Sequence, residues 1–377
     1  MIFVAESRNG DRIEYRDTKR YLWVLSLVMP IYTGGAALWY AFADRDPILP
    51  FVSLVLSFVV LPLVDMLVGE SDANPPEEVI ERMSEDGYYR VLLYLAVAVY
   101  WFAFLASAIT VGTGDLPVWA AVLLTLAAGV SSGTSITVAH ELGHKSSLLD
   151  RWAAKVALAI SGYAHFCIEH NRGHHTWAST PEDPSSARFG ESVYAFALRD
   201  IPHAFLRGVR GERDRLARKG IGFWSLRNDI VQGWLMSGLV ALALVLVFGW
   251  VMVPFLVVHH ALAWYMLTQA NYVEHYGLKR LRKPNGRYEP MQPRHSWNTN
   301  HVVSNLMLFH LQRHSDHHAN PMRPYQALRD HDDIPRLPSG YPGAFVLAAI
   351  PPLWRRVMDP KVIEVAGGDM ERVNTGP

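Results

Sequence analysis

The sequence has almost no cysteine, no net charge and few charged residues. Cys167 is the only cysteine in 377 residues, so the chain cannot close an internal disulfide, hold an iron–sulfur cluster or supply the paired thiolates of a Cys₄ iron site. Lys plus Arg and Asp plus Glu each number 35, so no overall field attracts a polyanion, and we exclude nucleic acid as a partner. No Gly-x-Gly-x-x-Gly motif is present for a flavin or nicotinamide fold. Any redox centre must therefore use ligands other than thiolates, and its reductant must be a separate molecule.

Charged residues make up 19% of the chain and apolar residues 50%, a balance typical of a polytopic membrane protein. The first long apolar run lacks a small-residue cleavage site, so we expect a retained helix there and not a signal peptide. The runs come in pairs with short connectors, which predicts three helical hairpins. We expect a single all-α integral membrane domain, residues 1–377, with six transmembrane helices. Each is about 20 residues long, enough to cross a bilayer, and they lie at about 21–40, 49–68, 91–111, 116–139, 230–250 and 251–272.

The loop charges predict the orientation, because Lys and Arg are retained on the cytoplasmic side. Five basic residues precede Tyr21 and thirteen lie in 140–229, whereas the short connectors contain only Arg45. We therefore expect both termini in the cytoplasm, together with a helical, histidine-rich cap formed by residues 140–229 and 273–377. The extreme ends, 1–10 and 366–377, are expected to be frayed.

Seventeen histidines contrast with the single cysteine, and nine of them are placed as metal ligands would be. Three clusters space histidines three to five residues apart, and on a helix the i, i+3 and i, i+4 positions share a face. The ninth histidine directly follows the sixth apolar run, at the depth where the first cluster follows the fourth run. The candidate ligands are His140, His144, His170, His174, His175, His275, His314, His317 and His318.

This number of imidazoles predicts two metal ions, since a single zinc takes four ligands. Imidazole suits iron, copper, zinc or nickel, so ligand type alone does not choose the metal. Four acids lie beside these histidines, and we expect them to accept the second N–H of an imidazole in preference to binding metal. They are Glu141, Glu169, Glu274 and Asp316.

The other histidines are expected to have structural roles. His259 and His260 lie within the sixth run, about four turns from His275, which is too far to share its metal. We expect polar packing for this pair, and we expect His301 and His310 to lie near the site without binding metal. The remaining four are His165, His203, His295 and His331.

These motifs on a polytopic chain resemble the integral-membrane fatty acid desaturase and hydroxylase superfamily with histidine-rich di-iron centres. Within it, His140–Lys145, Glu169–His175, Asn271–Gly277 and Leu311–His318 look like the signatures of membrane-bound alkane 1-monooxygenases (alkane omega-hydroxylases), and the resemblance covers nearly the whole chain. It implies two non-haem iron ions, O₂ as co-substrate and hydroxylation of the terminal methyl group of n-alkanes to 1-alkanols. It also implies rubredoxin as electron donor, with rubredoxin reductase upstream, and location in the bacterial inner membrane.

The expected substrate agrees with the chemistry of the site. A terminal C–H bond has no polar handle, so its oxidation needs a redox metal that activates dioxygen, and the substrate must be bound by apolar burial, about 0.8 kcal/mol per CH₂. Two helix faces lead from the bilayer to the histidines and are predicted to contact the alkane, although the glycines on them equally suit close helix packing. The residues on these faces are Gly129, Gly133, Ile136, Trp264, Leu267 and Thr268.

Other functions are compatible with parts of the pattern. His140 and His144 also match the zinc-protease motif His-Glu-x-x-His, but that function leaves the other clusters without a role. A desaturase or a xylene-type methyl hydroxylase would share the metal centre and differ in substrate. A metal transporter would carry its ligands at mid-membrane along a path.

Rubredoxin is expected to dock on the cap through complementary charge. The candidate basic segments are Arg207–Lys219 and Lys279–Lys283, with Arg172 or Arg313 nearer the metals. An alternative role for the first segment is to anchor the cap to anionic lipid.

Overall fold

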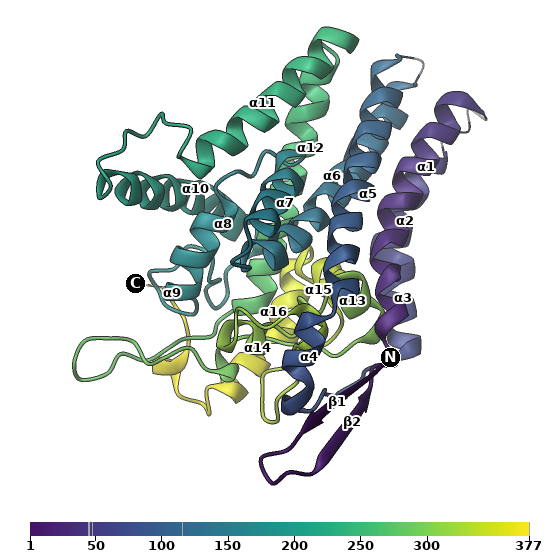
Figure 1. Cartoon of the computed structure of the whole chain (residues 1–377). Coiled ribbons are helices and arrows are strands. Elements are labelled where there is room, and N and C mark those ends of the chain that lie inside the picture. Colours follow the sequence, from purple (N-terminus) through teal and green to yellow (C-terminus); the bar gives the residue numbers. More distant parts are fainter. Residues whose placement is uncertain (44–45, 47, 115, 377) are drawn as a thin grey trace.

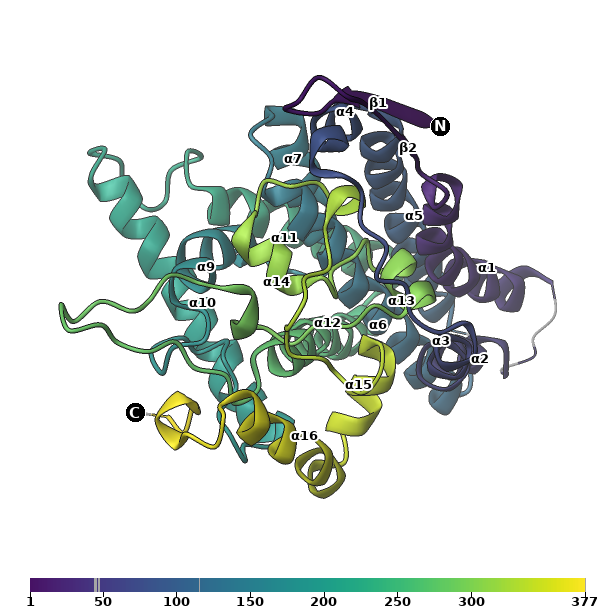
Figure 2. The same ribbon diagram turned by 90° about the horizontal axis from the view of Figure 1, so that it is seen from below.

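The computed structural model describes residues 1–43, 46, 48–114 and 116–376, and helices dominate it. Long helices run side by side, and the shorter elements gather at one end of the bundle, which they cover when it is viewed from below (Figures 1 and 2). The elements up to residue 112 are β1 (Ile2–Glu6), β2 (Arg12–Arg16), η1 (Arg20–Leu27), α1 (Val28–Phe42), α2 (Ile48–Val55), η2 (Leu56–Val60), α3 (Leu61–Val68), η3 (Glu77–Val79), α4 (Ile80–Glu85) and α5 (Gly87–Gly112).

The second half of the bundle and most of the cap follow. The elements up to residue 275 are α6 (Val118–Gly143), α7 (Leu148–Ala159), α8 (Phe166–Glu169), η4 (His170–His174), α9 (His175–Trp177), α10 (Val193–Ala217), α11 (Asp229–Phe248) and α12 (Met252–His275). The remaining elements are η5 (Pro293–His295), α13 (Val302–Met307), α14 (His314–Ala319), η6 (Tyr325–Ala327), α15 (Tyr341–Ala348), α16 (Pro351–Val365) and η7 (Met370–Arg372).

Four helices in the described part of the chain are long and apolar enough to cross a membrane, so the chain is a membrane protein. They are Arg20–Phe42 (η1 with α1), α5, α6 and α11, and they correspond to the predicted runs 21–40, 91–111, 116–139 and 230–250. The other two predicted runs are helical as well. α2, η2 and α3 together span Ile48–Val68, with a shorter apolar helix at Val52–Val68. α12 covers the sixth run but falls outside these four, and it carries His259 and His260.

The N-terminus is a β-hairpin, so the prediction of an all-α chain is wrong in this element and the prediction of frayed ends is wrong too. β1 and β2 pair antiparallel with Ile2 opposite Arg16, and Phe3 is buried in the core. Side chains of these short strands alternate between buried and exposed, a period of two that helical analysis does not detect. The C-terminal end is also ordered, because the Asn374 carbonyl accepts a hydrogen bond from the amide of Phe189.

Close packing between α6 and α12 fixes the inner part of the bundle. A methyl group at Gly133 would lie 2.6 Å from Cβ of Met266, and one at Gly129 would lie 3.1 Å from the carbonyl oxygen of His259. Glycine at these two positions therefore lets the helices approach, as small residues do in membrane bundles. α6 is accordingly enclosed, with 72% of its apolar window buried, whereas the corresponding share of α11 is 22%. α6 thus carries the first histidine cluster down the centre of the bundle.

Candidate metal centre

The nine candidate histidines converge on two adjacent points at the cap end of α6. In each group, one potential ligand atom per residue lies within 4.8 Å of all the others. The first group is His140, His144, His170, His175 and His317. The second group is His174, His275, His314 and His318.

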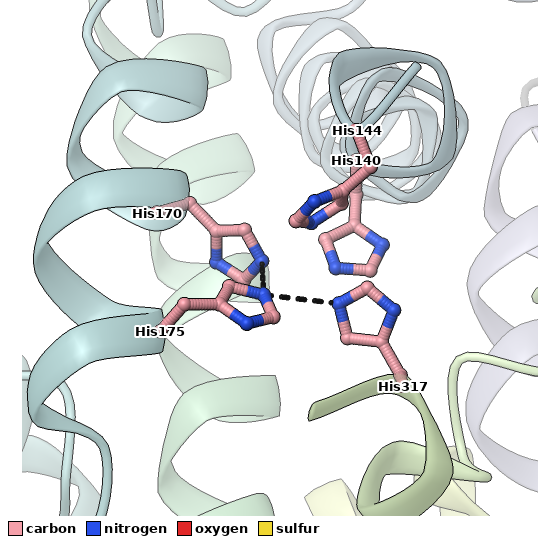
Figure 3. A group of neighbouring side chains, drawn as sticks. All are labelled: His140, His144, His170, His175 and His317. Carbon is pink, nitrogen blue, oxygen red and sulfur yellow. Dashed lines mark hydrogen bonds between the residues drawn. The ribbon is translucent and has the colours of Figure 1, made fainter. Parts of the chain in front are cut away.

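The first group draws on three separate parts of the chain (Figure 3). α6 supplies His140 and His144 one turn apart, the η4–α9 segment supplies His170 and His175, and α14 supplies His317. Nε2 of His175 lies 3.1 Å from Nε2 of His170 and 3.1 Å from Nε2 of His317. Ring nitrogens from three elements thus point at one space.

The second group is assembled in the same way from η4, the last residue of α12, and α14. Nε2 of His314 lies 3.2 Å from Nε2 of His275 and 2.9 Å from Nε2 of His318. His314 and His318 are one α-helical turn apart, which places them on one face of α14, while His317 points to the first group. α14 therefore contributes to both groups.

A π-turn distributes the second histidine cluster between the groups. η4 is a π-helix, in which hydrogen bonds run from residue i to i+5. This wider turn brings His170 and His175, five residues apart, into the first group and leaves His174 for the second. Sequence spacing pointed to a pair four residues apart, because an α-helix is the default period, and only the backbone shows the π-turn.

The unpaired nitrogens of the two groups fit metal ions. Nε2 of His140, His144 and His174 is buried and has no hydrogen-bond partner among the described residues. Elsewhere in the groups Nε2 atoms face one another at 2.9–3.2 Å, and two neutral imidazoles in such a pair form a hydrogen bond only if one Nε2 carries a proton and the other does not. Buried polar atoms normally have partners, and a cation at each point would satisfy all of these nitrogens together. Two divalent metals that accept imidazole therefore suit this donor set.

Burial also keeps most of the imidazoles in the cap neutral, as metal ligation requires. Loss of hydration lowers the pKa of His170, His314, His317 and His318 well below the ordinary value, and neighbouring histidines lower it further. Burial lowers the pKa of His174 as well, but the nearby Asp183 carboxylate outweighs burial and raises this pKa above the ordinary value.

Asp183 is a partner of the metal site that the sequence analysis missed. Its Oδ2 lies 3.0 Å from Nδ1 of His174, and its Oδ1 accepts a 2.7 Å hydrogen bond from Arg207. Arg207 also binds Glu169, so one guanidinium on α10 joins two buried carboxylates behind the second group. Asp183 lies in a loop nine residues after His174 and belongs to no histidine motif. A buried-loop carboxylate of this kind carries no sequence signal.

The four acids predicted to support the imidazoles occupy different places. Glu169 pairs with Arg207, as described. Glu141 pairs with Lys145 and accepts a hydrogen bond from the amide of Tyr325. Asp316 binds cap residues, among them His331 and Arg323. Within the described part of the chain, these three acids form no hydrogen bond with a histidine of either group.

Glu274 lies on the metal side of a candidate ligand. Its Oε2 is 3.3 Å from Nε2 of His314, the nitrogen that faces His275 and His318, and its Oε1 accepts a 2.9 Å hydrogen bond from Tyr341. For His275, the acceptor of the second imidazole N–H is not a carboxylate but the backbone carbonyl of His295, which lies 3.1 Å from Nδ1. Glu274 is therefore placed to contact a bound metal or the reacting end of a substrate.

Two adjoining cavities extend from the histidines into the bundle. The inner cavity touches His140, His170, His314 and Glu274 and is otherwise lined mainly by apolar side chains of α6, α12 and α15. The outer cavity lies among α1, α2, η2, α3 and α6. The two cavities share four lining residues, which are Thr134, Met266, Leu308 and Phe345. The two cavities therefore mark a mainly apolar path from the histidine groups to the helices α1, α2 and α3.

Half of the residues predicted to contact substrate line this path. Gly133, Ile136 and Leu267 line the inner cavity. Trp264 instead donates to the carbonyl of Ser161, and Thr268 donates to Asp200, both on the side of α12 away from the inner cavity. Gly129 packs against α12, as described. The cavity face of α12 is Met266, Leu267, Ala270, Asn271 and Glu274, which is rotated from the predicted face.

The remaining histidines lie outside both groups. Arg313, which was predicted as a docking residue, also lies outside them. Nε2 of His259 lies 2.9 Å from Oγ of Ser132, and His301 and His310 bond to cap or backbone oxygens. Arg313 is buried and donates to backbone carbonyls, among them that of Leu328, so it presents no surface to a partner.

Comparison with known proteins agrees with this geometry. The family model described as fatty acid desaturase matches residues 117–344. Alkane 1-monooxygenase of Ectopseudomonas oleovorans is 48% identical over 360 residues, which cover 96% of this chain and 90% of that protein. Alkane 1-monooxygenase 1 of Alcanivorax borkumensis is 45% identical over 378 residues, with 98% and 91% covered.

A more distant relative differs in the substrate that its name carries. The hydroxylase component of xylene/toluene monooxygenase from Pseudomonas putida is 26% identical over 231 residues, which is 60% of each chain. Identity and coverage are both much higher for the alkane enzymes. The chain therefore belongs to the alkane 1-monooxygenase family of the fatty acid desaturase superfamily.

Proposed function

We propose that this protein hydroxylates the terminal methyl group of n-alkanes to 1-alkanols at a di-iron centre, with O₂ and two electrons from rubredoxin. The observation that carries the proposal is the meeting of two all-histidine groups with the inner end of a long apolar path. The names of the relatives agree with it. One iron would be held by His140, His144, His170, His175 and His317, and the other by His174, His275, His314 and His318. Bound iron supplies the O₂ activation that no amino acid side chain provides.

The chain's own residues prepare the site for that chemistry. Asp183 fixes the orientation of His174 and leaves its Nε2 free for metal, and the His295 carbonyl does the same for His275. The inner cavity brings a terminal methyl group up to His140, His170 and His314, while its apolar walls exclude bulk water. Tyr341 and Glu274 are the polar pair at this end of the path and can hold a proton next to the reacting group.

The shape and chemistry of the path favour an unbranched alkane over the alternative substrates. Two cavities joined end to end accommodate an extended chain, whereas an aromatic ring needs only the inner one. A fatty acyl substrate carries a polar head group, for which a cation at the outer end would be expected. Among the described residues that line either cavity, none is Lys or Arg. Each CH₂ buried along the path contributes about 0.8 kcal/mol, so a longer chain that fits binds more tightly.

We further propose that all six predicted runs cross the bacterial inner membrane, with both termini and the cap in the cytoplasm. α2 to α3 and α12 complete the four clear spans, and they line the outer and inner cavities respectively. The basic residues before Tyr21 and in 140–229 support this orientation. An alkane dissolved in the bilayer would then reach the metals without crossing water.

The test combines metal analysis with product analysis. Purified protein in lipid nanodiscs should contain about two irons per chain and convert n-alkanes to 1-alkanols when reduced rubredoxin and O₂ are supplied. Aryl methyl substrates and fatty acids should be oxidised much more slowly. One zinc per chain with peptide cleavage would overturn the proposal in favour of a protease, and desaturated acyl products would overturn it in favour of a desaturase. The variant His203→Ala, on the exposed face of α10, is the matched control for any ligand-to-alanine change.

A further inference from the structure

α10 has three distinct faces. One face is buried against the rest of the protein and includes Phe196, Asp200 and Ala204. A second face is apolar but largely uncovered. Its stripe contains Tyr194 and Leu198, with half-buried Ile201 and Phe205 at the spacing of one helix face, and Leu198 is 82% exposed. The third face carries the polar side chains Arg199, His203, Arg207, Arg210 and Asp214. A helix in water would not leave such a stripe open.

The apolar stripe is continuous with the outer surface of α11, a candidate membrane span. The Phe205 ring lies 6.3 Å from the Trp234 ring on α11, and the Trp224 ring lies 6.3 Å from Trp234 on another side. Trp224 is 80% exposed. Above this aromatic cluster α11 presents exposed leucines, namely Leu235, Leu239, Leu242 and Leu246. Whatever covers the stripe must therefore also meet the surface that α11 presents to lipid.

The direction of α10 fits the plane of a membrane surface. In Figure 1, α10 lies across the direction of α11 and α12, at the lower end of α11. In the view from below, the whole length of α10 lies in the plane of the picture (Figure 2). Tryptophan is enriched at the membrane–water interface, and in-plane helices combine an apolar face with a basic polar face. The third face of α10 provides such a polar face next to the apolar stripe.

We propose that α10 is an interfacial helix that lies in the headgroup region of the bilayer. The stripe of Tyr194, Leu198, Ile201 and Phe205 would sit at the acyl boundary, about 5–10 Å deep as such helices do. Arg210 is the exposed arginine of the third face and would contact the phosphate groups of the lipids, whereas Arg199 and Arg207 pair with carboxylates of the protein. Trp224 and Trp234 fix the depth at which α10 meets α11. The occupant of the stripe is thus the lipid interface, and not a second protein.

This placement would connect the bilayer surface to the second histidine group. The buried face of α10 packs on α8 and η4, where a methyl group at Gly208 would lie 3.1 Å from Cβ of His165. Arg207 extends from the same helix to Asp183, which contacts His174. The depth of α10 in the interface therefore helps to set the position of that ligand.

Site-directed spin labelling tests the proposal without using enzymatic activity. In a Cys167→Ala background, which removes the only native cysteine, single cysteines replace Tyr194 and Leu198 on the stripe and His203 and Arg210 on the polar face. Leu239→Cys on α11 provides a lipid standard, and Asn285→Cys in an exposed loop provides an aqueous standard. Each labelled protein is reconstituted into bilayers of phosphatidylcholine and phosphatidylglycerol. Power-saturation EPR then compares collisions with O₂, which concentrates in lipid, and with a water-soluble nickel chelate.

Labels at 194 and 198 should collide several-fold more with O₂ than with the nickel chelate, as the label at 239 does, while labels at 203 and 210 should be reached by the chelate. If the stripe labels are as accessible to the chelate as the label at 285, the helix lies in water and the proposal fails. If they are shielded from both reagents, a protein covers the stripe and the proposal also fails. Two stripe positions are used so that a folding defect in one variant leaves the other as the test.

Discussion

Oδ2 of Asp183 lies 3.0 Å from Nδ1 of His174, which leaves Nε2 of the same ring facing the second histidine group. This arrangement holds the imidazole in one orientation and one tautomer, and it makes the ring a better ligand. Arg207 in turn fixes the carboxylate. The geometry of the second histidine group therefore depends on a residue that is outside the group and lies in no motif.

The first prediction concerns this carboxylate. Asp183→Asn keeps the size of the side chain but removes its charge, so the affinity of the second group for metal should fall about 10- to 100-fold. Iron analysis after a mild chelator wash should find about one iron per chain instead of about two. Asp214→Asn, which changes an exposed carboxylate on α10, is the control and should keep both. Two irons retained in the Asp183 variant under the same wash would contradict the assigned role.

The second prediction separates the two groups. His144→Ala removes a ligand from the first group and His275→Ala removes one from the second, so each should abolish or severely reduce turnover and lower the iron content. Mössbauer spectra of the two variants should lose different iron signals, because each variant empties a different site. Full iron and full turnover in the His275 variant would remove this residue from the ligand set and leave eight histidines.

The third prediction concerns chain length. Ile136 lines the inner cavity and Trp264 does not, so Ile136→Ala should shift the product profile towards longer alkanes while Trp264→Ala should leave it unchanged. A further buried CH₂ contributes about 0.8 kcal/mol, so the preference between successive alkanes should move by about fourfold. Competition between alkanes of different length, with products resolved by gas chromatography, measures this. The same shift in both variants would place the substrate on the other face of α12.

The fourth prediction is a pH dependence of the metal-free protein. Burial holds the pKa of His170, His314, His317 and His318 well below the unfolded value near 6.5, so below this pH the unfolded chain takes up protons that the folded chain refuses. Each such group lowers the free energy of unfolding by up to about 1.4 kcal/mol per pH unit. Glu169 and His174 act in the opposite direction, because burial raises the pKa of Glu169 to about 7 and the Asp183 carboxylate outweighs burial at His174 and raises its pKa, but they are two groups against four.

The melting temperature of the metal-free protein should therefore be flat between pH 8.5 and 7.5 and should fall steeply as the pH drops below 6.5. Differential scanning fluorimetry in detergent measures this directly. The variant His317→Ala removes one of the four groups and should show a shallower fall. A melting temperature that is independent of pH down to 5.5 would show that these imidazoles are not kept neutral by the fold.

The fifth prediction concerns the electron donor. The two predicted docking segments are Arg207–Lys219 and Lys279–Lys283. Their exposed basic groups include Arg213, Arg218 and Lys219 in the first and Arg282 and Lys283 in the second. Turnover supported by rubredoxin should fall as salt rises, because charge complementarity is screened. Reversal of charge at the true docking segment should raise the apparent donor KM several-fold and leave the iron content intact. Rates that are insensitive to salt and to reversal of either segment would point to an apolar contact instead.

The parts of this structure in which apolar residues or histidines recur at regular helical spacing could be predicted from the sequence. Each of the six apolar runs is a long helical segment in the structure, and the i, i+4 spacing of His140 and His144 placed both in one group. Features that depend on a local change in the number of residues per helical turn could not be predicted in this way. The π-turn at His170–His174 alters which side chains share a face. The side of α12 that borders the inner cavity could not be predicted either, because it is set by how this helix packs against its neighbours. Asp183 was beyond reach for a different reason, because only tertiary contacts bring that loop to His174.

The two histidine groups are interleaved along the chain, and this has a consequence for biosynthesis. His170 and His175 belong to the first group while His174 between them belongs to the second, and α14 again supplies both groups. Neither site is complete until the ribosome has passed residue 318, long after the membrane helices have been synthesised. The first group therefore receives its last histidine, and the second group two of its four, only after all six apolar runs have been synthesised. A truncation before α14 would leave an inserted protein with two incomplete sites, not one with a single working site.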